Sequence, residues 1–278
     1  MSAADPTIGV FDSGFGGLTV LRALIARAPQ ARYAFIGDTA RLPYGSKSSR
    51  TIARYAAQSA RFLVEEQGAE YLVIACNTAS ALALDAIKEA VPSSVSVIGV
   101  IEPGAEAAHR ASKTRDVLVI GTDATVQSHA YTAACRARGL RVLEMACPLL
   151  VPLVEEGWNS HPVTTDVLRI YLDKLSKEAS AQGLKPDTLV LGCTHYPLLR
   201  PLIEQIIPSE MKIIDSAEST ADKLMFHLCH DLPAPRKPTP DDLFLRCFAT
   251  DSVEKFERLG SRFLGRPTGK IELVDLGG

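Results

Sequence analysis

The stretches YLVIACNTAS at residues 71–80 and TLVLGCTHYP at residues 188–197 carry the same pattern and decide the fold expected for this chain. Each is a run of strand-forming residues that stops at a small residue and is followed by a cysteine, a polar residue and an apolar helical pattern. The pattern predicts a buried strand that ends at the cysteine and a helix that begins there. Cys76 and Cys193 are therefore expected at the edge of the sheet where open α/β folds bind ligands.

Two polar turns that follow other predicted strands repeat in the same way. Strand 8–11 runs into the turn DSGFGG at 12–17, and strand 116–120 runs into the turn GTDAT at 121–125. The turns are offset by roughly 110 residues and the cysteines by about 117 residues, which indicates a duplicated βα unit of domain size. A lone free cysteine usually packs as a small hydrophobe, but two in matching contexts favour a functional pair on opposite walls of one cleft.

The composition is that of a globular protein, with 278 residues, 46% of them hydrophobic, enough for one large or two medium domains. The net charge of −2 and the absence of a cationic block argue against nucleic acid and an acidic membrane surface as partners, so a small-molecule partner is expected. The sequence shows no secretory signal and no apolar run near about twenty residues, so we expect a cytoplasmic protein. The six cysteines follow no disulfide or zinc spacing, so reduced thiols and no metal are expected.

Other polar residues near the predicted strand ends are candidates for the same site. The glycine-rich turn at 12–17 opens a helix and predicts an anion cradle, although many such turns only reverse the chain. Asp38 opens the loop 39–47, whose proline and glycine predict an irregular path over the site; Asp38 could equally cap a nearby turn. Glu155 ends a predicted helix, where a solvated carboxylate is the ordinary interpretation.

Two thiols in a cleft leave three chemistries open, namely a redox disulfide, metal ligation and proton transfer. A redox pair usually shows short cysteine spacing and a metal site needs further ligands at regular intervals, and the sequence has neither. Ionising a thiol of pKa about 8.5 costs about 1.5 kcal/mol near pH 7.4, and a helix amino terminus supplies about 0.3–1 kcal/mol, or up to about 2 when partly buried. Proton transfer at carbon is therefore favoured, with one thiolate removing a proton from one face and the opposite thiol donating one to the other.

The residues around the cysteines suit a substrate that carries carboxylate and ammonium groups. Neutral donors for carboxylates are supplied by Ser13, Asn77, Thr78, Thr122, Thr125 and Thr194. The ionisable groups that could hold an ammonium group or tune the thiols are Asp12, Asp38, Glu155 and His195. A histidine at a helix start is otherwise often only a satisfied polar residue.

Six motifs, taken in order, resemble those of the glutamate racemases: GVFDSGFGGLTVL at 9–21, GDTARLPYG at 37–45, ACNTAS at 75–80, GTDAT at 121–125, CPLLVPLVEEG at 147–157 and GCTHYPLL at 192–199. The resemblance spans nearly the whole chain. It implies a cytoplasmic isomerase that interconverts L- and D-glutamate with no cofactor or metal and supplies D-glutamate for peptidoglycan synthesis, cell wall biogenesis and cell shape. No long amino-terminal extension of the kind that carries activator binding in some members precedes the first motif, so regulation by a cell-wall precursor is not expected.

The resemblance also implies a role for each candidate residue. The acid/base thiols are Cys76 and Cys193, and the supporting acid/base groups are Asp12 and His195, with Asp38 and Glu155 as further candidates. The implied substrate contacts are Asp12, Ser13, Pro43, Tyr44, Gly45, Asn77, Thr78, Thr122, Thr125 and Thr194.

The fold that the resemblance implies is a pair of pseudo-symmetric flavodoxin-like α/β domains with mainly parallel sheets and an active site in the cleft between them. Residues 1–99 and 212–278 are expected to form a discontinuous first domain, and residues 100–211 an inserted second domain. The oligomeric state, including a homodimer, stays open. Three rival functions also stay open: a racemase of aspartate or a hydantoin, a thiol redox protein, and an interaction role such as the restraint of DNA gyrase described for some glutamate racemases.

Overall fold

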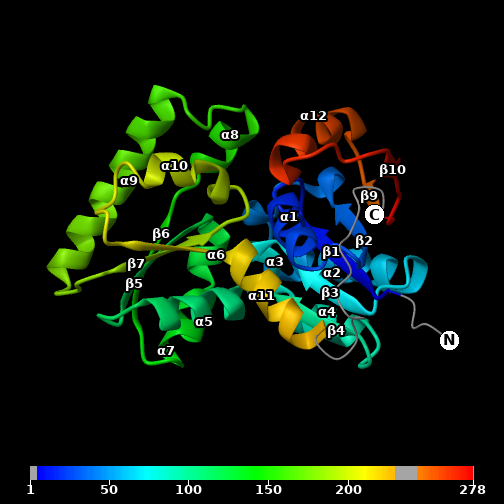
Figure 1. The fold of residues 1–278 in the computed structure, drawn as a ribbon, viewed down its shortest axis with the longest axis horizontal. Helices are drawn as coiled ribbons and strands as arrows, with labels where there is room; N and C mark the ends of the chain where they lie inside the picture. The colour runs from blue at the N-terminus through cyan, green and yellow to red at the C-terminus, as the bar shows by residue number, and fades with distance from the viewer. Residues whose placement is uncertain (1–4, 229–242, 278) are drawn as a thin grey trace.

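Two parallel β-sheets organise the computed structural model, which describes residues 5–228 and 243–277 (Figure 1). The larger sheet has six strands in the spatial order β10 (Ile271–Leu273), β9 (Phe244–Ala249), β2 (Arg32–Gly37), β1 (Thr7–Asp12), β3 (Tyr71–Ile74) and β4 (Ser96–Gly99). The smaller sheet has four strands in the order β6 (Arg141–Ala146), β5 (Asp116–Gly121), β7 (Thr188–Gly192) and β8 (Lys212–Asp215). Every strand pair in the described part of the chain is parallel, which confirms the predicted α/β class.

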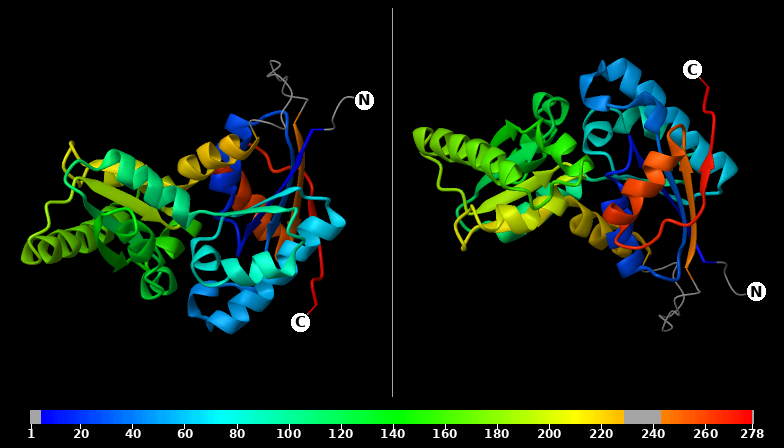
Figure 2. Two further views of the ribbon diagram at one scale, coloured as in Figure 1. Left: turned by 90° about the horizontal axis from the view of Figure 1, so that it is seen from below. Right: turned by 90° about the horizontal axis from the view of Figure 1, so that it is seen from above.

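The two sheets repeat one strand order. The order β2-β1-β3-β4 in the larger sheet corresponds to β6-β5-β7-β8 in the smaller one, and β9 and β10 are added beyond β2. Cys76 follows β3 and Cys193 follows β7, so the two thiols occupy equivalent strand ends beside β1 and β5. The unit around the smaller sheet, in green and yellow, stands beside the unit around the larger sheet, in blue, cyan and red (Figure 2). The predicted duplication is therefore present in the fold.

Helices cover both faces of the larger sheet, because successive residues of a strand point to opposite sides. Ile8 of β1 packs in one core with Leu21 and Phe256, whereas Phe11 of the same strand packs in another core with Ile52. Strands buried on both faces read as near-continuous apolar runs, which is why they could be predicted.

The helices of the larger unit are α1 (Leu18–Arg27), α2 (Ser49–Arg61), α3 (Asn77–Leu82), α4 (Leu84–Ala90) and α12 (Val253–Leu264), with the short 3₁₀ turns η1 (Thr39–Arg41) and η2 (Tyr44–Ser46) and the π-helical turn η3 (Phe62–Glu66). The remaining helices are α5 (Ile101–Ala111), α6 (Asp123–Gln127), α7 (Ala130–Arg136), α8 (Leu150–Glu155), α9 (Pro162–Ala181), α10 (Arg200–Ile203) and α11 (Ser216–Leu228), with the 3₁₀ turn η4 (Tyr196–Leu199).

The smaller sheet is inserted into the larger unit. The chain builds four strands of the larger sheet, then the whole smaller sheet, and returns to the larger sheet at β9. The chain was predicted to return to the larger sheet at residue 212, and for strand β8 this is wrong. Strand β8 belongs to the smaller sheet, where it pairs in parallel with β7 and Ile213 lies beside Leu189. Helix α11 follows β8, packs against both α1 and α5, and lies between the two units in Figure 1. The limits of two independently folding domains stay a prediction.

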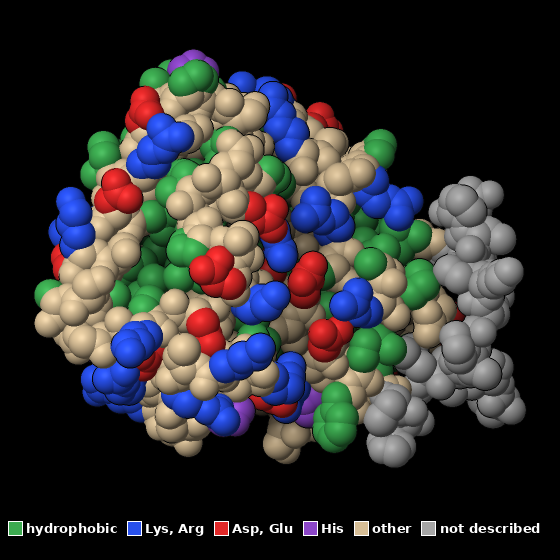
Figure 3. Space-filling view, turned by 60° about the vertical axis from the view of Figure 1, so that its left-hand side comes forward, with side chains coloured by type: hydrophobic (Ala, Val, Ile, Leu, Met, Phe, Trp, Pro, Cys, Tyr) green, Lys and Arg blue, Asp and Glu red, His purple; other side chains and the backbone are tan. Residues whose placement is uncertain are grey.

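The surface carries charges of both signs. On the face shown in Figure 3, Lys and Arg side chains are interspersed with Asp and Glu side chains and form no single basic field. Within the described residues, no helix combines the length and the apolar character needed to cross a bilayer.

Candidate active site

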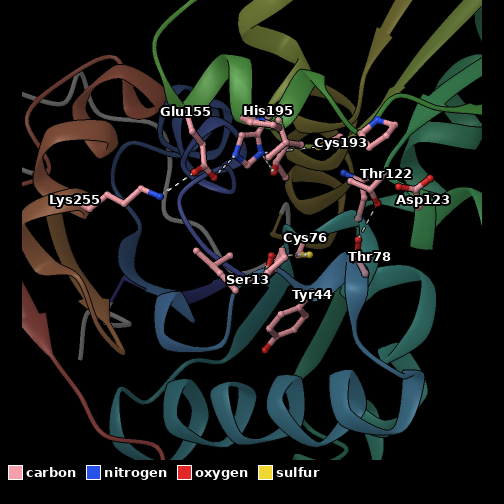
Figure 4. Close-up of a pocket in the computed structure, with 18 residues that line it drawn as sticks. Ser13, Tyr44, Cys76, Thr78, Thr122, Asp123, Glu155, Cys193, His195 and Lys255 are labelled. Atoms are coloured by element: carbon pink, nitrogen blue, oxygen red, sulfur yellow. Dashed lines mark hydrogen bonds and ion pairs between the residues drawn. The ribbon is translucent and has the colours of Figure 1, made fainter. Parts of the chain in front are cut away.

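A cavity of about 530 Å³ lies at the carboxyl ends of the central strands of both sheets (Figure 4). Its wall includes one residue that follows each of the four central strands: Ser13 after β1, Cys76 after β3, Thr122 after β5 and Cys193 after β7. The predicted site residues that line it are Ser13, Pro43, Tyr44, Gly45, Cys76, Asn77, Thr78, Thr122, Glu155, Cys193, Thr194 and His195. The cavity therefore takes side chains from both units, including both cysteines.

Three predicted residues do not line the cavity, and six residues that were not predicted do. Asp12, Asp38 and Thr125 lie behind its wall. The additional lining residues are Leu42, Asp123, Pro148, Val151, Pro152 and Lys255. Five of these lie within the motifs at 37–45, 121–125 and 147–157, whereas Lys255 belongs to α12 and had no local sequence signal that distinguished it from a solvated lysine.

Cys76 is held at the start of α3 by two hydrogen bonds. Its Sγ accepts the backbone N–H of Ala79 at 3.4 Å and donates to Ser13 Oγ at 3.3 Å. Burial and, to a smaller extent, the negative charge of Asp12 raise the pKa of the Cys76 thiol to about 12, although the hydrogen bonds with Ser13 and Ala79 partly oppose the rise. The expectation that the helix start nearly covers the cost of ionisation is therefore wrong for Cys76, because burial outweighs the short helix.

Cys193 is supported by a chain of polar side chains instead. His195 Nδ1 lies 3.9 Å from Cys193 Sγ, and His195 Nε2 lies 3.3 Å from Glu155 Oε1. Burial alone lowers the pKa of His195, but the hydrogen bonds to Cys193 and Glu155 and the charges of those groups outweigh it and raise the pKa to about 10. His195 is therefore expected to carry a positive charge beside Cys193 at neutral pH.

Glu155 is a partner of His195 rather than a solvated helix end. Its second oxygen, Oε2, lies 3.0 Å from Lys255 Nζ. Burial raises the pKa of Glu155, but the hydrogen bonds and charges of His195 and Lys255 outweigh this and lower it to about 2. The imidazole of His195 also packs edge-on against Phe263 of α12, with ring centroids 5.1 Å apart. The orientation of the imidazole is thus set from three sides.

Asp12 lies directly behind Cys76 and Ser13. Its Oδ2 accepts the backbone N–H of Gly14 at 2.9 Å, while its Oδ1 has no hydrogen-bond partner among the described residues. Burial raises the pKa of Asp12, and the charge of His195 opposes that rise. A buried carboxylate oxygen without a partner is costly, so Asp12 is suited to receive a proton or an ammonium group at this place.

Asp38 positions the loop that covers the cavity. Its carboxylate is fully buried and accepts hydrogen bonds from Tyr44 Oη at 2.5 Å, Arg41 Nε at 2.9 Å and Thr250 Oγ1 at 2.9 Å. It makes no side-chain cap for η1, so neither a turn cap nor a place on the cavity wall describes it. Its role in the structure is to hold Tyr44 against the site.

A cluster of hydroxyl groups joins the two units across the cavity. Thr78 Oγ1 lies 3.1 Å from Thr122 Oγ1 and 3.4 Å from Thr125 Oγ1, and the latter two lie 2.9 Å apart. Thr122 also caps α6 by accepting the N–H of Thr125 at 3.4 Å. Thr125 therefore supports Thr122 and Thr78 from behind rather than lining the cavity.

Tyr131 fixes the orientation of the Asn77 amide, because it occupies the amide oxygen. Tyr131 Oη donates to Asn77 Oδ1 at 2.8 Å, and Asn77 Nδ2 has no protein partner within the described residues. Asn77 follows Cys76 in the larger unit, whereas Tyr131 lies on α7 of the smaller one. A buried amide with two unused N–H groups is arranged to donate to a carboxylate.

The turn after β1 presses against the residues that follow Cys193. Thr19 Oγ1 donates to the backbone carbonyl of Thr194 at 3.0 Å. A Cβ added to Gly16 would lie only 2.2 Å from Thr194 Oγ1 and 2.6 Å from His195 Nδ1, so only glycine fits there without a shift.

Among the described residues, no group of three or more His, Cys, Asp and Glu side chains is arranged to hold a metal ion.

Two like parallel sheets that bring a strand-end thiol each to one cavity match a known class of enzyme. The family profile described as Asp/Glu/Hydantoin racemase matches residues 16–224 of the chain, which places the protein among the amino-acid racemases, a class of isomerases. A glutamate racemase from Koribacter versatilis (strain Ellin345) is 53% identical over 300 residues, with 100% of each chain covered.

Solved structures agree. A glutamate racemase isoform from Bacillus anthracis superimposes with a TM-score of 0.87 at 38% identity and covers 98% of each chain. A glutamate racemase from Francisella tularensis subsp. tularensis SCHU S4, solved in complex with D-glutamate, gives a TM-score of 0.86 at 34% identity, with 99% of this chain and 98% of that chain covered. The chain therefore belongs to the glutamate racemase family.

Proposed function

We propose that this protein interconverts L- and D-glutamate by moving a proton at the α-carbon between Cys76 and Cys193. The observation that carries the proposal is the place of the two thiols, which follow equivalent strands of two like sheets and reach one cavity. A carbon acid bound between them meets one acid/base group on each face, which is what inversion of the centre requires.

The neutral donors of the cavity would hold the carboxylates of the substrate. Asn77 offers two unused N–H donors, and Ser13, Thr78 and Thr122 offer hydroxyl groups. Hydrogen bonds to a carboxylate are charge-assisted and therefore strong. They also draw charge away from the α-carbon, which makes its proton easier to remove.

The proton inventory of one turnover balances with two thiols. In one direction Cys76 reacts as the thiolate, takes the α-proton and becomes a thiol, while the Cys193 thiol donates to the opposite face and becomes a thiolate. The reverse direction exchanges these roles. The enzyme then returns to its starting state by exchanging protons with solvent, for which Asp12 beside Cys76 and His195 beside Cys193 are the nearest ionisable groups.

Ionisation of Cys76 needs help from the substrate, because burial and Asp12 raise its pKa to about 12. The ammonium group of bound glutamate would bring a positive charge into the cavity that Cys76 lines, in front of the buried Asp12 carboxylate. An opposite charge within about 4–6 Å favours the ionised form of a group. Thiolate formation would thus be coupled to substrate binding, and no pyridoxal phosphate, metal or nucleotide takes part in any step.

The physiological role that we propose is the supply of D-glutamate for peptidoglycan synthesis, and hence for cell wall biogenesis and cell shape, in the cytoplasm. It is supported by membership of the glutamate racemase family.

The test is to incubate each enantiomer of glutamate with the enzyme in deuterated water and to follow α-deuterium by NMR together with optical rotation. We expect deuterium incorporation and loss of rotation with both enantiomers. If neither enantiomer incorporates deuterium or loses rotation, the proposal is refuted. The same assay with aspartate and with a hydantoin separates the rival racemases. Cys76→Ser and Cys193→Ser should each abolish racemisation, and full turnover in either variant would show that its thiol is structural.

A further inference from the structure

Lys255 is an ionisable residue of the cavity that takes no part in the proposed proton transfers. It lies on α12, in the segment that returns to the larger sheet, whereas its partner Glu155 ends α8 in the smaller unit. The Lys255 side chain is 41% exposed and that of Glu155 is 20% exposed. This ion pair therefore crosses between the two units at the edge of the cavity, as Figure 4 shows.

The ion pair is the first link of a chain that ends at a thiol. Lys255 Nζ lies 3.0 Å from Glu155 Oε2, Glu155 Oε1 lies 3.3 Å from His195 Nε2, and His195 Nδ1 lies 3.9 Å from Cys193 Sγ. Each oxygen of Glu155 therefore serves a different partner. Lys255 prevents the carboxylate from rotating away from His195, because rotation would separate Oε2 from the ammonium group.

Helix α12 is fixed against α8 at a second point, so the position of Lys255 is well defined. A Cβ built on Gly157, which follows α8, would lie 2.3 Å from Arg262 Nη1, so the Arg262 guanidinium lies directly against this turn. Gly157 has a φ of +80°, a conformation that favours glycine. Phe263 of α12 packs against the imidazole of His195. One helix of the larger unit thus contacts Glu155, the turn behind it and His195.

We propose that Lys255 is a positioning residue for proton transfer at Cys193, and that it acts by holding Glu155 so that Glu155 holds His195 beside the thiol. The inference rests on the proposed glutamate racemisation. Cys76 is held differently: within the described part of the chain its sulfur hydrogen-bonds to Ser13 and to the backbone of Ala79, and neither is linked to Lys255. Loss of Lys255 is therefore expected to slow the proton transfer that involves Cys193 and to leave the one at Cys76 unchanged.

The two enantiomers cannot report this difference through kcat/KM alone. Since L- and D-glutamate have equal free energies in water, kcat/KM must fall by the same factor in both directions. Isotope effects on kcat/KM with α-deuterated substrates do report it. When the Cys193 step becomes slower, the effect rises for the enantiomer that loses its proton to Cys193 and falls for the other, whose later protonation becomes limiting.

The experiment compares Lys255→Met, Lys255→Arg, Glu155→Gln and the double variant Lys255→Met/Glu155→Gln with the wild type. Lys174→Met serves as the matched control, because Lys174 forms an exposed ion pair with Glu178 on α9. We expect Lys255→Met to lower kcat about fivefold with little change in KM, Lys255→Arg to restore most of it, and the control to match the wild type. In the Glu155→Gln background, Lys255→Met should have almost no further effect, because it acts through Glu155.

Two outcomes would overturn the inference. A loss in Lys255→Met that appears mainly as raised KM and persists undiminished in the Glu155→Gln background would make Lys255 a direct substrate contact. If kcat is unchanged in Lys255→Met, or if the isotope effects of the two enantiomers do not diverge from their wild-type values, Lys255 has no role in proton transfer at Cys193. A wild-type enzyme that exchanges no α-proton of glutamate would instead refute the proposed function, so the two failures are distinguishable.

Discussion

Gly16 brings the turn after β1 against Thr194 and His195, and its replacement by alanine perturbs the site from behind while leaving both thiols in place. The added Cβ would lie 2.2 Å from Thr194 Oγ1 and 2.7 Å from His195 Cε1. Real carbon contacts are near 3.5–4.0 Å, so one or both residues must move by about 1 Å. The backbone of Thr194 is also tied to Thr19 on the following helix, which limits how the strain can spread.

The magnitude follows from two opposing effects on stability and one on rate. Overpacking a filled site costs about 1–3 kcal/mol, and replacing a glycine of ordinary backbone conformation regains about 0.4–1 kcal/mol by restricting the unfolded chain. The net loss is therefore about 0–2.6 kcal/mol, which a stable domain survives. A misplacement of about 1 Å in a catalytic group can cost about a hundredfold in rate. Gly16→Ala is thus expected to fold and to racemise about a hundredfold more slowly.

The assay is steady-state racemisation followed by circular dichroism, with thermal unfolding measured on the same samples. Gly9→Ala is the matched control, because its Cβ would lie 2.9 Å from Ala69 Cβ near the start of β1, at the opposite end of that strand from the site. The control should lose stability and keep kcat. The reasoning would be refuted if Gly16→Ala kept wild-type kcat, or if Gly9→Ala lost as much activity at equal stability.

Three further changes probe the groups around the cavity. Tyr131→Phe frees the Asn77 amide to flip, so KM for glutamate should rise about 3–10-fold with little change in melting temperature; an unchanged KM would contradict the fixed amide. Asp38→Asn weakens the buried contact with Tyr44, so KM for glutamate should rise and the free energy of unfolding, measured by chemical denaturation, should fall by about 1–3 kcal/mol. Wild-type KM and stability would show that the loop keeps its position without the Asp38 carboxylate. The pKa of His195 is raised from 6.5 to about 10, so its contribution to stability should be complete below pH 6.5 and fall as the pH rises toward about 10. The melting temperature of the wild type should therefore fall over this pH range, and that of His195→Gln should lack this part of the fall. Identical pH dependence of the two melting temperatures would contradict the raised pKa.

The fold could be predicted from the sequence because its central strands are buried on both faces. Such strands read as apolar runs, and the residue that ends each run falls at the ligand edge of the sheet. The place of β8 could not be predicted in the same way, because Lys212–Asp215 is short and only partly buried. Its pairing with β7 is decided by tertiary packing and not by its own pattern.

The candidate site divides along the same line. Residues directly after the strands, such as Ser13, Cys76 and Thr122, line the cavity as predicted. Lys255 could not be found, because its contact with Glu155 depends on how α12 packs against the end of α8. The raised pKa of Cys76 was missed for a related reason, since a local helix argument contains neither the burial of the thiol nor the charge on the neighbouring strand.

The pseudo-symmetry of the fold breaks at the ionisable groups. By strand register, Asp12 beside β3 corresponds to Gly121 beside β7, which has no side chain, and His195, two residues after its cysteine, corresponds to Thr78. The two thiols therefore differ in their ionisable neighbours, with a carboxylate beside Cys76 and an imidazole beside Cys193, and the charge of His195 partly opposes the burial that raises the pKa of Asp12. In the proposed mechanism this asymmetry has a use, because His195 places a positive group beside Cys193, whereas the ammonium group of the substrate would favour the ionised form of Cys76.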